Sequence, residues 1–315
     1  MTKIKYLIYA AVFTAVLLCL VGCAFGIRTH YLYKDGEKFT AGDRVITEKI
    51  ETIDIDYVKG DVRLTAGETG EITIRETSEK AIEDKLKVHT YVDGTTLYIR
   101  FAASEKRLDF YDLEKQLEIT VPNNITFDRI KINMSSGDVA CTGIKAETVE
   151  AEASSGCLAV NGEAKKIVMK ASSGNLTLTQ TGESDSVVLE TSSGKIRAEL
   201  GNVRKLSAEA SSGTVRIYAN AVEELTAETS SGDQEYRLVN VPKKSRVKAS
   251  SGDVTMYLPM EANLTAALEV SSGDISYEQQ FAKRGDSYVC GDGSSQMSIE
   301  TSSGDITFRQ YSDGE

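Results

Sequence analysis

Acidic side chains recur at fixed spacing in the C-terminal half of the sequence and are the first candidates for chemistry. Three glutamates stand four residues before the glycine of successive Ser-Ser-Gly motifs, and three aspartates directly follow such a glycine: Glu190, Glu209, Glu228, Asp233, Asp253 and Asp274. Carboxylates stacked about 5 Å apart can hold a divalent cation such as calcium. A solvated charged face also explains the glutamates, and turn capping explains the aspartates. We therefore assign no metal site and keep a cation ladder as the alternative.

Other residue types that support catalysis are scattered. The two histidines, His30 and His89, lie far in sequence from any cysteine or acidic cluster. The five cysteines lack the C-x-x-C spacing of a zinc site, and their odd number does not predict a disulfide framework; they are Cys19, Cys23, Cys141, Cys157 and Cys290. Neither a G-x-S-x-G nor a G-x-x-x-x-G-K-[ST] motif occurs. The sequence predicts no catalytic centre and no cofactor.

The elements that carry these residues are set by a repeat. Ser-Ser-Gly recurs nine times, at intervals of 19, 18, 20, 19, 19, 20, 21 and 31 residues. Its glycines are Gly137, Gly156, Gly174, Gly194, Gly213, Gly232, Gly252, Gly273 and Gly304. A period of this size is the signature of stacked repeats, so it decides the fold class.

Aligning the copies on the glycine gives four columns that are almost wholly apolar, seven and five residues before it and two and four residues after it. Ile196, Ala198, Leu206 and Ala208 are examples. The alternation predicts two short strands per coil, each with one buried face. The polar Ser-Ser-Gly-Asp stretch between the strands predicts a corner, which a glycine in a left-handed conformation allows.

Coils of about 19 residues cannot each bury a core, so neighbours must stack and pair their strands in parallel at about 4.8 Å. Nine coils then form a rod on the order of 40 Å long. The predicted fold is all-β: a parallel β-solenoid, or β-helix-like stack, of Ser-Ser-Gly coils with an irregular β region before it.

The domain limits follow from these patterns. We expect a membrane anchor or lipoprotein signal at 1–27, a polar stalk at 28–45, an N-terminal β region at 46–125, the Ser-Ser-Gly solenoid at 126–310 and a tail at 311–315. Within the N-terminal region, the stretch around Gly60 fits the coil template, and Asp93-Gly94 predicts a hairpin. Residues 79–87 could form one short helix, and a loop at 279–296 would fill the long last interval.

The N-terminus predicts membrane attachment. Residues 6–27 form an apolar run that is long enough to span a bilayer. Lys3 and Lys5 before it favour a cytoplasmic N-terminus, which places the rest of the chain outside. In a second interpretation, Leu-Val-Gly-Cys ending at Cys23 is a lipoprotein box and Cys23 is lipidated. Both interpretations give a cell-membrane protein, single-pass or lipid-anchored, with an extracytoplasmic C-terminal domain.

Composition excludes one class of partner. The 315 residues carry a formal net charge of -11 and no Lys/Arg-rich stripe. Such a chain repels phosphate backbones, so nucleic acid is not expected as a partner.

The coil repeats, the Lys59-Gly60-Asp61-Val62 segment and the strand at 117–122 resemble the bacterial "putative adhesin" family, a domain of unknown function, over roughly residues 46–310. The resemblance implies a β-solenoid ectodomain on membrane-anchored envelope proteins, with no catalytic residues to transfer. The expected function is a non-enzymatic binding module whose partner is an envelope protein, a glycan or a copy of itself. The alternative is an accessory or sensing protein in the envelope stress response, acting through a membrane partner. A self-assembling scaffold and a polysaccharide-active β-helix enzyme are further alternatives.

Overall fold

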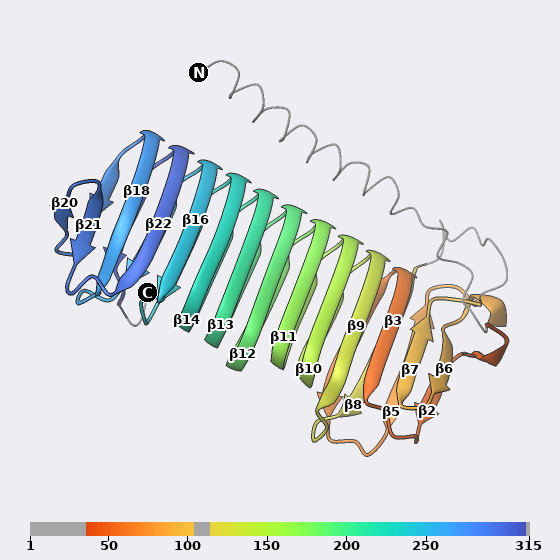
Figure 1. Ribbon diagram of the computed structural model, residues 1–315. Helices are drawn as coiled ribbons and strands as arrows, with labels where there is room; N and C mark the ends of the chain where they lie inside the picture. The colour runs from red at the N-terminus through yellow and green to blue at the C-terminus, as the bar shows by residue number, and fades with distance from the viewer. Residues whose placement is uncertain (1–35, 104–113, 313–315) are drawn as a thin grey trace.

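Parallel strands stack along one axis in the computed structural model, which describes residues 36–103 and 114–312 (Figure 1). The middle of the stack consists of five long strands, each of which begins two residues after a repeat glycine and ends at the serine before the next one. They are β10 (Val139–Ser155), β11 (Leu158–Ser173), β12 (Leu176–Ser193), β13 (Ile196–Ser212) and β14 (Val215–Ser231). Consecutive strands pair in parallel, so equivalent residues of successive coils lie side by side. The predicted all-β parallel stack is confirmed.

Each long strand contains both arms that the sequence predicts as separate short strands. The corner at the glycine is a true break, but the bend at the opposite edge is a bulge through which the ladder continues. Register shifts mark this bend between Thr142 and Ile144 and between Gln180 and Glu183. A bulge turns a strand sharply while it keeps most of its hydrogen bonds, which explains why the coil has one break instead of two.

The glycine corner stacks directly on the corner of the next coil. The repeat glycines have positive φ angles, for example 147° at Gly213, and the N–H of Gly213 donates to the carbonyl of Ser231 at 2.9 Å. A Cβ added to Gly213 would overlap the carbonyl of Gly194. Only glycine fits both the left-handed backbone and this close approach.

The core lies between the two arms of every coil, and the four predicted apolar columns face it. Ile196, Ala198, Leu206 and Ala208 are all buried. A fifth column, three residues before the glycine, is also mostly buried although it was not predicted from the sequence. This column holds small residues, alanine or threonine in most coils, and its Thr191 hydroxyl donates to the carbonyl of Gly174 at 3.1 Å.

The coil order departs from the chain order at both ends. At the N-terminal end, the predicted coil around Gly60 is formed by β3 (Thr52–Lys59) and β4 (Asp61–Gly67), which pair in parallel with β9 (Phe127–Ser136) and β10. An outer coil, formed by β7 (Thr96–Arg100) and β8 (Lys115–Pro122), lies on its other side. The region expected to be irregular thus adds two coils to the stack.

Antiparallel strands cover the outer coil at this end, and we call them, with the turns between them, the N-terminal cap. In this cap β5 (Ile72–Ser78) pairs with β8 and with β2 (Arg44–Ile46), and β6 (His89–Asp93) pairs with β7 and with β1 (Thr40–Ala41). The predicted hairpin at Asp93-Gly94 joins β6 to β7. Two expectations are corrected. The helix expected at 79–87 is only a 3₁₀ turn at Asp84–Leu86, and the range given to the stalk contains β1 and part of β2 as well as a 3₁₀ turn at Gly36–Lys38.

At the C-terminal end the last coil of the chain is inserted one place inward. Its first strand β22 (Ser295–Ser303) lies between β16 (Lys244–Ser251) and β18 (Leu264–Ser272), as Figure 1 shows. The second arms follow the same order: β15 (Gln234–Leu238), β17 (Val254–Leu258), β23 (Ile306–Gln310) and β19 (Ile275–Tyr277). The loop expected at 279–296 contains a hairpin of β20 (Ala282–Arg284) and β21 (Ser287–Cys290), which covers β18. The chain order expected for the stack is therefore wrong at this end.

Among the described residues, no helix is both long and apolar enough to cross a membrane. The expected anchor at 1–27, with Cys19 and Cys23, and the residue His30 lie outside the described residues.

Candidate functional site

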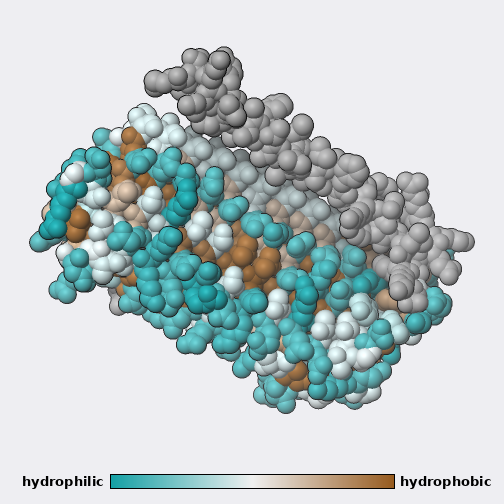
Figure 2. Space-filling model, in the orientation of Figure 1, coloured by the Kyte–Doolittle hydropathy of each residue, from teal (hydrophilic) through white to brown (hydrophobic). Residues whose placement is uncertain are grey.

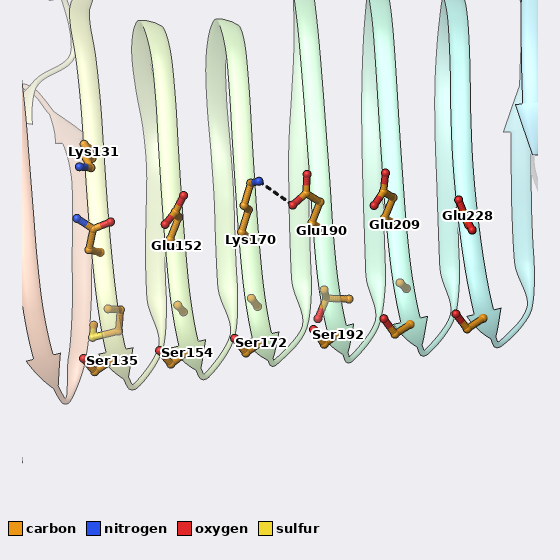
Figure 3. Close-up of a pocket in the computed structure, with 18 of the residues that line it drawn as sticks. Lys131, Ser135, Glu152, Ser154, Lys170, Ser172, Glu190, Ser192, Glu209 and Glu228 are labelled. Atoms are coloured by element: carbon orange, nitrogen blue, oxygen red, sulfur yellow. Dashed lines mark ion pairs between the residues drawn. The ribbon is translucent and has the colours of Figure 1, made fainter. Parts of the chain in front are cut away.

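The arms that precede the glycines form one outer face of the stack, which we call the serine face. Its outward residues are those two and four positions before each glycine, because the residues three, five and seven positions before it point into the core. A shallow groove of about 880 Å³ runs along this face across several coils. Serines 135, 154, 172, 192, 211 and 230 line one side of the groove, and the column four residues before the glycine lines the other (Figure 3).

The three glutamates singled out in the sequence are brought together in this groove. Glu190, Glu209 and Glu228 are direct register partners on β12, β13 and β14. Figure 3 shows their carboxylates in a row on successive strands. A lysine stands at each end of the row, because Lys170 is the register partner of Glu190 and Lys248 that of Glu228.

Because the lysines stand at the two ends of the row, the negative charge of Glu209 in the middle is the least neutralised of the three. Lys170 Nζ lies 2.7 Å from Glu190 Oε2, and Lys248 Nζ lies 2.7 Å from Glu300 on its other side. Partial burial, and then the carboxylates of Glu190 and Glu228, raise the pKa of Glu209 above its ordinary value. The row is therefore mildly repulsive at neutral pH.

The predicted aspartates lie at the glycine corner and take part in hydrogen bonds between coils. Asp233 Oδ1 accepts the N–H of Asp253 at 3.0 Å, and Asp253 Oδ1 accepts the N–H of Asp305 at 2.8 Å. Asp305 in turn accepts the N–H of Asp274 at 2.9 Å, which follows from the inserted last coil. The carboxylates of Asp233 and Asp253 each satisfy an amide that the corner leaves free, so turn capping accounts for these two residues, whereas Asp274, on the outermost coil, takes part through its N–H.

The serines of the groove are not hydrogen-bonded to a general base within the described residues. A serine becomes a nucleophile when a hydrogen-bonded base in its unprotonated form accepts its proton. Lys170 is the basic group nearest in register to Ser172, but its hydrogen bond to Glu190 raises its pKa and keeps it protonated. The serine hydroxyls and carboxylates instead form a regular set of hydrogen-bond donors and acceptors, repeated about every 4.8 Å.

The remaining candidates do not join this site. Over residues 36–103 and 114–312, no group of three or more His, Cys, Asp and Glu is placed to hold a metal ion. Cys141 is buried in the core, where burial raises the pKa of its thiol to about 12, and Cys157 and Cys290 are also free thiols. His89 lies in the N-terminal cap with Nδ1 2.8 Å from the carbonyl of Lys87. Burial lowers the pKa of this imidazole.

One polar cluster was not predicted from the sequence. Lys115 takes the place of the corner glycine in the outer N-terminal coil and is fully buried, with Nζ 2.7 Å from Glu76 Oε1. It also donates to the carbonyls of Leu86 and Phe101, and the Tyr57 hydroxyl donates to Glu76 at 2.7 Å. Burial lowers the pKa of Lys115 to about 8, against the opposing effect of Glu76. The only sequence signal was a lysine two residues before Leu117, where the template has glycine.

The solved structures that are similar to this chain include three bacterial proteins from two Parabacteroides species. A crystal structure of a "putative adhesin" from Parabacteroides merdae ATCC 43184 matches with a TM-score of 0.51 and 13% identity, covering 84% of this chain and 96% of that one. A "putative adhesin" from Parabacteroides distasonis ATCC 8503 gives a TM-score of 0.44 at 14% identity, covering 84% and 95%. A "putative lipid binding protein" from the same organism gives 0.46 at 17%, covering 85% and 96%. At 13% identity the first match supports the fold alone.

No curated protein matches the chain. The family comparison is decisive, since the match spans residues 50–309 and therefore includes both the outer N-terminal coil and the inserted last coil. The resemblance expected from the coil repeats is confirmed: the chain belongs to the Toastrack DUF4097 family.

Proposed function

We propose that this protein is a non-enzymatic, membrane-anchored binding module of the cell envelope, with its coil array outside the cytoplasmic membrane. The observation that carries the proposal is the constant register of the outward columns on the serine face, where serine hydroxyls and carboxylates repeat from coil to coil. Such a face suits contact with another extended surface or a polymer, because it offers many equivalent hydrogen bonds and no enclosed pocket for a small substrate.

The partner is an envelope protein, a glycan or a second copy of the chain. A net charge of -11 works against nucleic acid. The membrane attachment rests on the apolar run at 6–27 and on the lysines before it.

Protease accessibility tests the location. In intact protoplasts, added protease should degrade the chain after Arg28, while a tag at Met1 survives until the membrane is lysed. Protection of the coil array in intact protoplasts contradicts the proposal. Inhibition of lipoprotein signal peptidase then separates the two anchors, because only a lipoprotein with its lipid on Cys23 shifts in mass.

Site-specific crosslinking tests the binding role. A photo-crosslinking residue at Ser211, on the serine face, should capture a discrete envelope component from living cells. The same photo-crosslinking residue at Glu71, an exposed position on the N-terminal cap, is the control. Equal labelling from both positions argues against a binding face.

A further inference from the structure

The outer face opposite the serine face carries a row of alternating arginine and tyrosine side chains. Its members lie three or five residues after a repeat glycine, on β13, β14, β15, β17 and β23; we call the set Arg197, Tyr218, Arg237, Tyr257 and Arg309 the arginine–tyrosine ladder. The guanidinium carbons of Arg197 and Arg237 lie 5.6 and 5.4 Å from the ring centroid of Tyr218. Those of Arg237 and Arg309 lie 4.5 and 5.9 Å from that of Tyr257.

The tyrosine rings fix the guanidinium groups in place. β14 is flanked by β13 and β15, so the two arginines reach Tyr218 from the strands on either side. Cation–π contacts of this kind stabilise a defined orientation of each arginine. Arg197 and Arg237 are also held by carboxylates on their own strands, at 2.8 Å from Glu199 and 2.9 Å from Glu235.

The columns that form the ladder carry an excess of positive charge. In stack order from β13 to β23, the positions three and five residues after the glycine hold four arginines, with Arg216 as the fourth, and two glutamates. A third glutamate, Glu278 directly after the next strand β19, continues the register beside Arg309, and its carboxylate accepts the N–H of Gln310. Arg216 reaches Glu235 only at 3.8 Å, and Arg309 forms no ion pair within the described residues. Both arginines keep donor groups for an external anion, in a chain whose net charge is -11.

A groove of about 430 Å³ runs beside the ladder and has an apolar floor. Its lining includes the buried Leu200 and Ala219, Val239, which is 37% exposed, and Tyr311. The one carboxylate in the lining, that of Glu199, is paired with Arg197 at 2.8 Å. Tyr218 and Arg237 line both the groove and the ladder. Arginine guanidinium groups held in fixed orientations thus lie next to an apolar surface, and both follow the stacking axis of the coils.

We propose that the ladder and its groove bind a linear anionic glycan. The fork geometry of arginine fits carboxylate and phosphate groups in two-point contacts. Arg237 and Arg309 are two coils apart, about 10 Å along the stack, a spacing comparable to a disaccharide repeat. The apolar faces of the sugar rings pack on Val239 and Tyr311. This site goes beyond the proposed function, which concerns the serine face.

The test measures binding of polygalacturonate to the full-length protein in detergent micelles at about 0.15 M salt. We expect saturable binding, with a Kd that rises about tenfold in the double variant Arg216→Gln/Arg309→Gln, because both exposed guanidinium groups are removed. Arg237→Lys should also weaken binding, since it keeps the charge and loses the fork. Arg246→Gln, an exposed arginine on the opposite face, is the matched control and should change Kd by less than about twofold. Melting temperatures of the variants establish that they are folded.

Three comparisons decide the outcome. Methyl-esterified polygalacturonate, which lacks the charges, should not bind. A poly(glycerol phosphate) polymer that binds more tightly than polygalacturonate, with the same loss in Arg216→Gln/Arg309→Gln, identifies phosphate as the anion and supports the site. Equal loss in Arg246→Gln, equal binding of single-stranded DNA, or no binding of either polymer overturns the inference. These results leave the serine-face crosslinking untouched, so the two proposals fail independently.

Discussion

The serine face and the arginine–tyrosine face are built on the same coils and differ only in their outward columns. Four residues before the glycine, carboxylates dominate and repel one another, as at Glu190, Glu209 and Glu228. Three and five residues after it, arginines and tyrosines alternate and attract. The inward columns on both sides are buried along most of the stack and become exposed only at the outermost strand β19, where Tyr277 is 43% exposed. The coil frame therefore constrains the inner residues and leaves each outer face free to acquire its own chemistry.

The two faces also differ in extent. The serines two residues before the glycine occur in every Ser-Ser-Gly coil, whereas the ladder begins only at β13. On β10 and β11, the equivalent positions after the glycine hold small or neutral residues such as Ala140, Thr142, Ala159 and Asn161. Figure 2 shows one side of the molecule, where hydrophilic residues cover much of the surface and hydrophobic ones gather near the middle of the stack. The serine column thus extends along the whole array, whereas the ladder is confined to the coils from β13 onward.

The first prediction separates inward from outward positions on one strand. Ile196→Asp places a charge in the core, where Ile196 is 1% exposed, and should lower the free energy of unfolding by about 4 kcal/mol or more. Arg197→Asp, on the next residue, removes a surface ion pair and one cation–π contact and should cost about 1 kcal/mol. Chemical denaturation measures both. Comparable losses from the two substitutions would contradict the assignment of Ile196 to the core and of Arg197 to the surface.

The second prediction concerns the corner that joins the faces. Gly213→Ala should destabilise the protein by about 3 kcal/mol, because its φ of 147° is strained for alanine and the added Cβ overlaps the carbonyl of Gly194. Gly70→Ala is the control, since a Cβ there meets nothing within 4 Å. Thermal unfolding followed by circular dichroism compares them. A silent Gly213→Ala would mean that the corners do not stack closely.

The third prediction contrasts a serine in the core with serines on the surface. Ser245 occupies an apolar column, is 3% exposed, and its hydroxyl has no hydrogen-bond partner within the described residues. Ser245→Ala should stabilise the protein by about 1 kcal/mol, since a buried unpaired hydroxyl is removed. Ser207→Ala, at an outward position of β13, should have little effect. Destabilisation by Ser245→Ala would indicate that its hydroxyl has a partner, such as a buried water.

The sequence predicted the part of the fold that repeats. Alternation and glycine spacing were enough to identify the parallel stack, the four inward columns and the coil around Gly60, because each coil obeys the same local rules. The coil order at the ends was beyond this reasoning. The last coil satisfies the same template wherever it stacks, and its insertion between β16 and β18 depends on which neighbours it buries best.

The candidate sites were predicted unevenly for the same reason. The row of Glu190, Glu209 and Glu228 follows directly from register, so the sequence identified it. The ladder combines a column three residues after the glycine with one five residues after it, and Arg197 reaches Tyr218 diagonally between coils. The cluster at Lys115 joins five separate segments at the N-terminal end of the stack. Such contacts arise from tertiary packing and leave no periodic signal.

The fourth prediction, the smallest in size, tests whether the glutamate row is a repulsive face. The pKa of Glu209 is raised in the folded protein, so its ionised form is less favourable folded than unfolded. The stability linked to this group is full below the ordinary carboxyl pKa and is lost as the pH rises through the raised value. Glu209→Gln should therefore stabilise the protein at pH 7 by a few tenths of a kcal/mol, after screening by solvent, and this gain should vanish at acidic pH.

Calcium provides the decisive control for that prediction. A repulsive, solvated row gains little from the ion, so millimolar calcium should leave the melting temperature of the wild type almost unchanged. A row that holds calcium gains stability by mass action, and the gain should disappear when Glu190, Glu209 and Glu228 are all replaced by Gln. We expect the first result, because Lys170 already neutralises Glu190 at 2.7 Å. A calcium-dependent rise in melting temperature that is lost in the triple variant would contradict this expectation. It would show that the serine face, and not only the arginine–tyrosine face, binds ions.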